Sequence, residues 1–388
     1  MKKLILFALL IVAASCGRRF DGPLYLDPEA DIEARVEDAL SRMNLDEKIA
    51  AIHAQSTFSL PGVKKLGIPE LWTSDGPHGV RPEVPWNDWG NPGWNNDSCV
   101  AFPALTCLAA SWNREVAGQY GKALGEEARF REKDVILGPG LNMYRSPLCG
   151  RNFEYMGEDP LLAAKTSSQY IKGVQSQGVM ASVKHFALNN QETDRHHISS
   201  DADERTINEI YFPAFKAAVD AGVATVMSSY NLVNNVHAAE NEWLLKETLK
   251  GRWGFEGFVM SDWTSTYSTL GCVRSGLDLE MPEGFCMNYD AIKPLIETGV
   301  VREKDIDGKV ETILASLIAY GFLDRPQLDT TIKEDNPYSR EVAYKLSCES
   351  AVLLKNEGAL PLRKGGRVAL MGPRADIIPC GGGSGSVD

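Results

Sequence analysis

Several short apolar runs in this sequence end in polar side chains that could do chemistry on a bound ligand. One run ends in Asp262 and Trp263, and an earlier run ends in Lys184 and His185. At the end of a buried strand, Asp262 would be aimed at a ligand, and Lys184 could form a Schiff base with a carbonyl group. Simpler interpretations remain open, because Asp262 could cap the following helix and His185 could be a satisfied core histidine.

The elements that must position these residues alternate along the chain. Strand-like apolar runs are followed by helical stretches through residues 28–322, and the runs end in Asp, Lys, His or Tyr. Alternating strands and helices predict a parallel sheet, and polar residues at many strand ends predict a closed (β/α)8 barrel of the TIM type. An open doubly wound sheet is the alternative, but its site would draw on fewer strand ends.

The pattern changes after the predicted barrel. Residues 323–338 carry two proline-terminated polar turns, which is typical of a linker. Residues 339–388 begin with a helical stretch, and the apolar run 367–373 reads as the first strand of an α/β sandwich domain. One strand and a glycine-rich loop cannot bury a core of their own, so we expect this second domain to be truncated.

The N-terminus, residues 1–16, resembles a bacterial lipoprotein signal. Two lysines precede a short apolar run, and small residues stand directly before Cys16. Such a signal predicts that Cys16 becomes the lipidated N-terminus, so that the protein is exported and touches the membrane of the bacterial cell envelope only through its lipid anchor. The alternative is a secreted protein that is cleaved nearby.

Composition excludes several classes of function. The formal net charge is -12 and the isoelectric point is near 5.1, which argues against a nucleic-acid-binding surface. Apolar residues make up 44%, as in ordinary soluble proteins. The cysteines are scattered, without a CxxC pair or a histidine spacing suited to zinc, so neither a metal nor a cofactor is predicted.

Five motifs, in this order, resemble glycoside hydrolase family 3, and the resemblance extends over residues 30–360. They are Asp75-Gly76-Pro77-His78-Gly79-Val80-Arg81, Gly150-Arg151-Asn152-Phe153-Glu154, Gly157-Glu158-Asp159-Pro160, Lys184-His185-Phe186 and Ser261-Asp262-Trp263. Two segments, 149–154 and 276–282, are more similar to β-glucosidases than to β-xylosidases of this family.

The resemblance implies a retaining, exo-acting β-glycosidase that removes terminal β-D-glucosyl residues from oligosaccharides or other β-glycosides. Asp262 stands at the nucleophile position, and Trp263 would offer a flat face to the sugar unless it serves only in packing. The other matched positions bind sugar hydroxyls or line the site, and they are Asp75, Arg81, Arg151, Lys184, His185, Arg195 and Tyr230. Asp75 could instead serve only as a turn-forming residue.

The acid/base residue is the main departure from the family pattern. The resemblance implies that this glutamate comes from the second domain, so we expect it to be missing from this chain. Glu192 is set aside as a partner acid, and Glu158, Asp159 and Glu204 are interpreted as residues at helix starts. The loop after Lys184-His185-Phe186 lacks the Pro-Gly-His-Gly signature of another branch, which uses a His-Asp pair. A β-xylosidase and a non-catalytic sugar-binding envelope lipoprotein remain the alternatives.

Overall fold

The computed structural model describes residues 20–90, 92–93, 99–376 and 382–387. Cys16 and the rest of the predicted signal, residues 1–16, lie outside this part of the chain. Within the described residues, none of the helices combines the length and the apolar character needed to cross a membrane.

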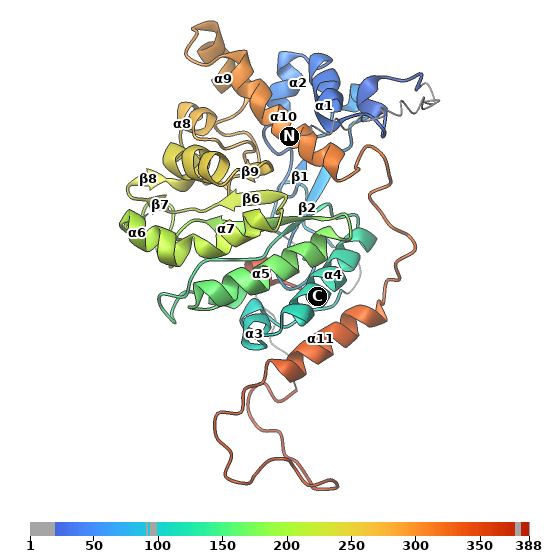
Figure 1. Cartoon of the computed structure of the whole chain (residues 1–388), viewed down its shortest axis with the longest axis vertical. Coiled ribbons are helices and arrows are strands. Elements are labelled where there is room, and N and C mark those ends of the chain that lie inside the picture. Colours follow the sequence, from blue (N-terminus) through green and yellow to red (C-terminus); the bar gives the residue numbers. More distant parts are fainter. Residues whose placement is uncertain (1–19, 91, 94–98, 377–381, 388) are drawn as a thin grey trace, which may run out of the picture.

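A curled sheet forms the interior of the protein (Figure 1). Among the described residues it has six strands in the order β1-β2-β3-β4-β6-β9, which are parallel except for the antiparallel β1. Single bridges from Met260 to Leu279 and from Glu280 to His53 continue the curl beyond β9. The strands are β1 (Ser59–Leu60), β2 (Leu71–Asp75), β3 (Val135–Leu137), β4 (Met180–Phe186), β6 (Thr225–Ser228) and β9 (Phe258–Met260).

The predicted α/β barrel is therefore present in an irregular form. The segment 277–281, which the sequence predicts as a further strand, makes only isolated bridges. A small second sheet in the described region contains β5 (Ser199–Ser200), β7 (Leu232–Val233) and β8 (Val236–His237), and it lies outside the main sheet. The curl still brings the carboxyl ends of the parallel strands together at one edge.

Helices cover the outside of the sheet. The long helices α4 and α5 pack against each other and α7 packs on α5, whereas α1 packs against α10 near the top of the view in Figure 1. The α-helices are α1 (Ile32–Ser41), α2 (Leu45–Ala50), α3 (Leu105–Ala110), α4 (Arg114–Phe130), α5 (Pro160–Gln175), α6 (Glu204–Thr206), α7 (Pro213–Asp220), α8 (Thr269–Arg274), α9 (Tyr289–Glu297), α10 (Glu303–Ala319) and α11 (Pro337–Glu349). Two π-helical segments, Ile207–Tyr211 and Trp243–Arg252, complete the cover.

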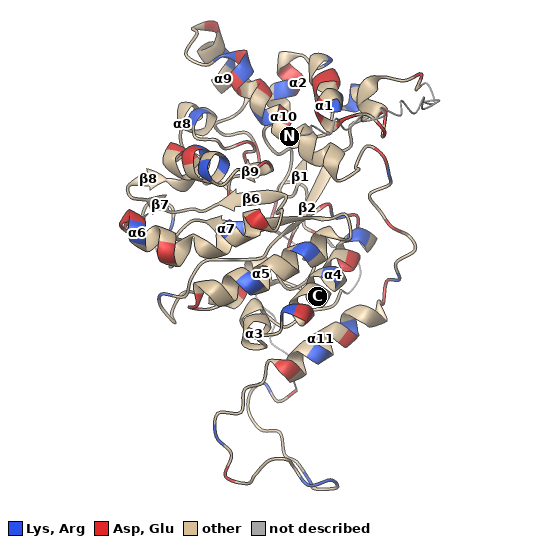
Figure 2. Ribbon diagram, viewed as in Figure 1, with Lys and Arg blue, Asp and Glu red and all other residues tan. Residues whose placement is uncertain are grey.

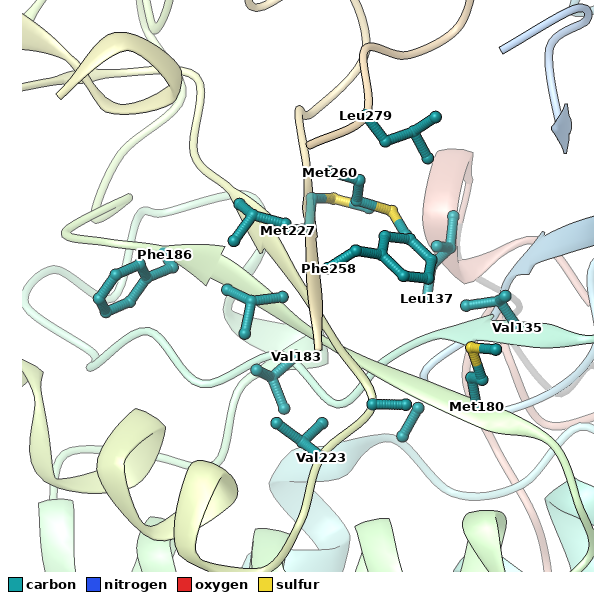
Figure 3. Packing of buried hydrophobic residues seen from close by; sticks show 14 of the residues in the cluster. Val135, Leu137, Met180, Val183, Phe186, Val223, Met227, Phe258, Met260 and Leu279 are labelled. Carbon is teal, nitrogen blue, oxygen red and sulfur yellow. The ribbon is translucent and has the colours of Figure 1, made fainter. Parts of the chain in front are cut away.

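The strands are apolar because helices or the interior cover both of their faces. Figure 3 shows side chains of β3, β4, β6 and β9 gathered in the core, among them Leu137, Met180 and Phe258. Figure 2 shows the charged residues mainly on helices and loops. Every residue of β4 is buried, including Lys184 and His185 near its end. Burying two ionisable side chains in one strand is costly, so the site that Lys184 and His185 face must account for them.

The last part of the chain differs from the sequence-based expectation. Helix α11 packs against α4, but residues 351–376 contain neither helix nor strand and are exposed. The strand predicted at 367–373 is therefore not formed here, since a strand needs a neighbouring strand to satisfy its backbone groups. Residues 382–387 return to the barrel, where Ser384 contacts Glu154. The division into a barrel, a linker and a second domain stays a prediction.

Candidate active site

A cavity of about 320 Å³ opens at the carboxyl edge of the sheet. Asp75 is the last residue of β2, Lys184 and His185 lie near the end of β4, and Asp262 follows β9 closely. Parallel strands bring their carboxyl ends to one edge, so residues far apart in sequence meet there. The cavity lining includes all the residues that the sequence singled out for a ligand site: Asp75, Arg81, Arg151, Lys184, His185, Arg195, Tyr230, Asp262 and Trp263.

Asp262 does not cap a helix. Its Oδ1 accepts a hydrogen bond of 2.8 Å from the Trp263 amide, and the next helix, α8, begins only at Thr269, where Ser268 is the cap. Oδ2 of Asp262 is buried and makes no hydrogen bond of good geometry among the described residues, although the Tyr230 hydroxyl stands beside the carboxylate and lowers its pKa as a nearby donor. The backbone thus holds Oδ1 of Asp262, and Oδ2 faces the cavity, where a ligand could reach it.

The surroundings of Asp262 act on its charge in opposite directions. Burial raises the pKa of the Asp262 carboxyl group to about 6, although the positive charges of Arg151 and Lys184 and the Trp263 amide lower it. Oδ2 lies 3.9 Å from Nη1 of Arg151 and 3.6 Å from Nε2 of His185. The carboxylate is therefore the main form at pH 7, but its pKa lies only about one unit below that pH.

Glu154 organises the cations of the site. It is fully buried, pairs with Arg151, and lies 3.3 Å from Nζ of Lys184. Burial acts to raise the pKa of Glu154, but Arg151 and Lys184 outweigh it and hold this pKa at about 2. Glu154 is not among the site residues predicted from the sequence, although it stands in the same motif as Arg151.

Asp75 contacts one of these cations, Lys184, together with Arg81. Its two carboxylate oxygens lie 3.4 Å from Nζ of Lys184 and 3.4 Å from Nη1 of Arg81. Lys184 is therefore shared between Asp75 and Glu154. A carboxylate that is held in place by two cations is well suited to accept hydrogen bonds from neighbouring hydroxyl groups of a ligand.

The loop after β4 adds residues that the sequence analysis set aside or placed only approximately. Glu192 lines the cavity, and its carboxylate lies 2.6 Å from Nη1 of Arg195. The Arg195 guanidinium stacks 3.7 Å from the ring centre of Tyr230, which lies just after β6. Glu192 could have been found as a carboxylate that closely follows the Lys184-His185 pair.

The remaining acidic residues of the sequence analysis serve the fold. Asp159 accepts hydrogen bonds from the first amides of α5, where Pro160 is the first helical residue. Glu204 is the first residue of α6. These predicted helix starts are confirmed, and neither residue lines the cavity.

The aromatic residues of the cavity differ in exposure. Trp263 is only 7% exposed, and its indole N–H donates a hydrogen bond of 2.8 Å to the Thr57 carbonyl. Trp89, which the sequence analysis did not single out, also lines the cavity and is 52% exposed. The Arg81 guanidinium lies 5.1 Å from its ring centre. Of the two rings, Trp89 presents the larger free face.

The segment 382–387 completes the wall beside Glu154. The Ser384 hydroxyl donates a hydrogen bond of 3.0 Å to Oε2 of Glu154, and Arg81 donates one of 2.7 Å to the Gly383 carbonyl. The site thus combines two distant parts of the chain. Three carboxylates (Asp75, Glu192 and Asp262) and four cations (Arg81, Arg151, Lys184 and Arg195) line the cavity, and the buried Glu154 carboxylate behind the wall balances the fourth cation. A balanced cavity suits a polar ligand without net charge.

The fold and this cavity place the chain among α/β barrels that bind their ligand at the carboxyl edge of the sheet. The N-terminal domain of glycosyl hydrolase family 3 matches residues 63–316. The chain therefore belongs to glycosyl hydrolase family 3, and the barrel fold predicted from the sequence is confirmed.

Curated and solved relatives agree with this assignment. Beta-glucosidase BoGH3A of Bacteroides ovatus is 46% identical over 93% of this chain and 51% of its own length, and a beta-glucosidase of Rhizobium radiobacter is 38% identical over 90% and 42%. The structure of beta-glucosidase 3B from Thermotoga neapolitana with glucose is 36% identical and has a TM-score of 0.83, over 91% of this chain and 52% of that protein. The chain thus spans about half the length of the curated relatives that it matches.

Proposed function

We propose that this chain carries the nucleophile and the hydroxyl-binding groups of a retaining, exo-acting β-glycosidase that hydrolyses terminal β-D-glucosyl residues. The observation that supports this most is the Asp262 carboxylate, which is buried at the carboxyl edge of the barrel with Oδ2 facing the cavity between Arg151 and His185. The relatives named above are β-glucosidases, and one of the solved structures contains glucose. These names support glucose as the sugar.

In the proposed reaction, Oδ2 of Asp262 attacks the anomeric carbon while the bond to the leaving-group oxygen breaks, and the leaving group departs as an alcohol after it gains a proton or, if it is acidic, as an anion. Water then hydrolyses the covalent glycosyl-enzyme, which releases the sugar and restores the Asp262 carboxylate. The hydrogen bond from the Trp263 amide fixes the carboxylate, and Arg151 lies close enough to favour its ionised form. Asp75, Lys184 and the neighbouring cations would hold the sugar hydroxyls on the far side of the cavity. Binding energy from these contacts would orient the anomeric carbon for attack.

The proton donor to the leaving group is not assigned to the described residues of this cavity. A carboxyl group must be protonated to act as a general acid, and the pKa of Glu154 is held at about 2 by Arg151 and Lys184. Asp75 and Glu192 are taken up by ion pairs with Lys184 and Arg195. An activated substrate whose leaving group needs no proton therefore tests the nucleophile by itself.

The experiment is to incubate the protein with 2,4-dinitrophenyl 2-deoxy-2-fluoro-β-D-glucoside and to map the modified peptide by mass spectrometry. We expect a fluoroglucosyl adduct on Asp262 and a stoichiometric release of dinitrophenol, because the fluorine slows hydrolysis of the intermediate. The matching fluoroxyloside, run in parallel, should label more slowly. Reversible binding without an adduct would contradict the proposal, and so would an adduct on another carboxylate.

The rate of this labelling should depend on pH through Asp262. Only the ionised carboxylate attacks, and its raised pKa means that this form is lost as the pH falls through about 6. We therefore expect the second-order labelling rate to fall about tenfold between pH 7 and pH 5. A midpoint near pH 4 instead would show that Asp262 titrates like an ordinary exposed aspartate.

A further inference from the structure

A line of buried polar groups lies behind the cavity wall and ends at His185. The Asn189 amide nitrogen lies 3.3 Å from the Tyr155 hydroxyl, and this hydroxyl lies 3.0 Å from Nδ1 of His185. Nε2 of His185 lies 3.6 Å from Oδ2 of Asp262. Tyr155, His185 and Asn189 are at most 1% exposed, so water does not compete for these contacts.

Asn189, at the end of this line that is most distant from Asp262, sets which groups donate and which accept. The Asn189 amide nitrogen also lies 3.3 Å from Oε1 of Glu192, whose carboxylate can only accept. The Asn189 NH₂ group is therefore the one that faces both Glu192 and Tyr155. The Tyr155 oxygen accepts from Asn189, and its single proton is left to be donated to Nδ1 of His185.

The charge states of the two rings agree with this direction. Burial raises the pKa of the Tyr155 hydroxyl well above its usual value, so the hydroxyl keeps its proton. Burial and the neighbouring Arg151 and Lys184 lower the pKa of His185 well below its usual value, so the imidazole is neutral. A neutral imidazole that accepts at Nδ1 carries its proton on Nε2.

We propose that Tyr155, oriented by Asn189, is a positioning residue that holds His185 in the Nε2–H tautomer and turns this N–H toward the ligand and Asp262. Nε2 of His185 and Oδ2 of Asp262 are both buried without a hydrogen-bond partner in the part of the chain that the structure describes. The opposite tautomer would set the lone pair of Nε2 against the carboxylate. An N–H there can instead donate to a sugar hydroxyl.

The backbone of His185 is fixed separately. The Asn142 side chain accepts a hydrogen bond of 2.8 Å from the His185 amide and donates one of 2.9 Å to its carbonyl. Tyr155 is therefore not needed to place the main chain of β4 at this point. Its substitution should change the protonation and orientation of the ring more than the position of the strand.

The role of Tyr155 in the reaction rests on the proposed function, but the tautomer does not, so the two can fail separately. The test is a long-range 1H–15N spectrum of protein labelled with 15N-histidine, recorded without substrate. The chain has six histidines, and a His185→Gln variant identifies the signals of His185. We expect an unprotonated Nδ1 and a protonated Nε2, and an Nδ1–H tautomer in the unaltered protein would overturn the inference.

Tyr155→Phe removes the donor to Nδ1. We expect the His185 signals to shift toward a mixture of tautomers, and the labelling rate by the fluoroglucoside to fall about tenfold, as for the loss of one orienting hydrogen bond. Tyr170→Phe is the matched control, because Tyr170 is also fully buried and its hydroxyl donates to the Pro77 carbonyl. This control should leave the His185 signals unchanged.

Asn189→Leu provides a second variant if Tyr155→Phe does not fold. It removes the donor that forces the Tyr155 proton toward His185, so it should also yield a mixture of tautomers. Unchanged His185 signals in a folded variant would overturn the positioning role. The protein could show the Nε2–H tautomer of His185 and yet never be labelled by the fluoroglucoside. That outcome would uphold the tautomer and contradict the proposed glycosidase function.

Discussion

Replacing Asp262 with asparagine is expected to abolish labelling by the fluoroglucoside and to lower the turnover of aryl β-glucosides by about 10⁴-fold. The amide has almost the shape of the carboxylate, but it does not attack the anomeric carbon. The cavity and the contacts of the cations would otherwise stay in place. Steady-state kinetics with an activated aryl glucoside and mass spectrometry of the treated protein measure the two effects.

The stability of this variant shows whether the loss is chemical. Burial raises the pKa of Asp262 above that of an unfolded aspartate, so its ionised form destabilises the folded state above pH 6. The asparagine side chain carries no charge, and the thermal midpoint of Asp262→Asn at pH 7.5 should equal or exceed that of the unaltered protein. The difference should shrink at pH 5, where Asp262 is protonated. A lower midpoint at pH 7.5 would attribute the lost activity to unfolding.

Replacing Glu154 with glutamine is expected to lower the free energy of unfolding by roughly 3–5 kcal/mol, because it leaves buried cations without their counter-charge. The Glu154 carboxylate pairs with Arg151 and with Lys184, both of which face the cavity. Its depressed pKa means that the stabilisation is fully present at neutral pH and is lost progressively as the pH falls from the ordinary glutamate value of 4.5 through about 2. Urea denaturation at pH 7 measures the change.

Glu154→Gln should also slow the labelling of the folded protein at least tenfold, because Arg151 and Lys184 would move from their positions around the ligand. Glu127→Gln is the matched control. Glu127 is buried in α4, and its carboxylate lies 2.6 Å from Nη1 of Arg131, outside the cavity lining. The control should also lose stability while its folded fraction is labelled at the normal rate. Equal slowing in both variants would mean that Glu154 acts only through stability.

Much of the candidate site could be predicted from the order of residue types along the chain. Asp75, Lys184, His185 and Asp262 each follow or end an apolar strand, and the cavity brings all of them together. The physical reason is that parallel strands place their carboxyl ends at one edge, so a repeated local pattern becomes a single site. The start of α5 at Asp159 was predictable for a similarly local reason, since its side chain caps the amides next to it in sequence.

Other properties of the site depend on contacts between distant parts of the chain. Trp263 is buried where its ring packs near Phe58 and its indole N–H reaches the Thr57 carbonyl, and the wall beside Glu154 includes Ser384. The strand predicted at 367–373 is not formed, because strand propensity alone does not supply a hydrogen-bonding neighbour. None of these outcomes can be read from a local pattern.

Strand periodicity and the motifs are local properties, and they were enough to predict the family, the barrel fold and nine of the residues that line the cavity, although not Trp89 or Glu192. Only the tertiary structure decided that Asp262 faces the cavity instead of capping a helix, since α8 begins at Thr269, well beyond it. It also decided the charge balance around Glu154 and the raised pKa of Asp262. Desolvation and Coulomb interactions depend on distances in space, which the order of residues does not specify.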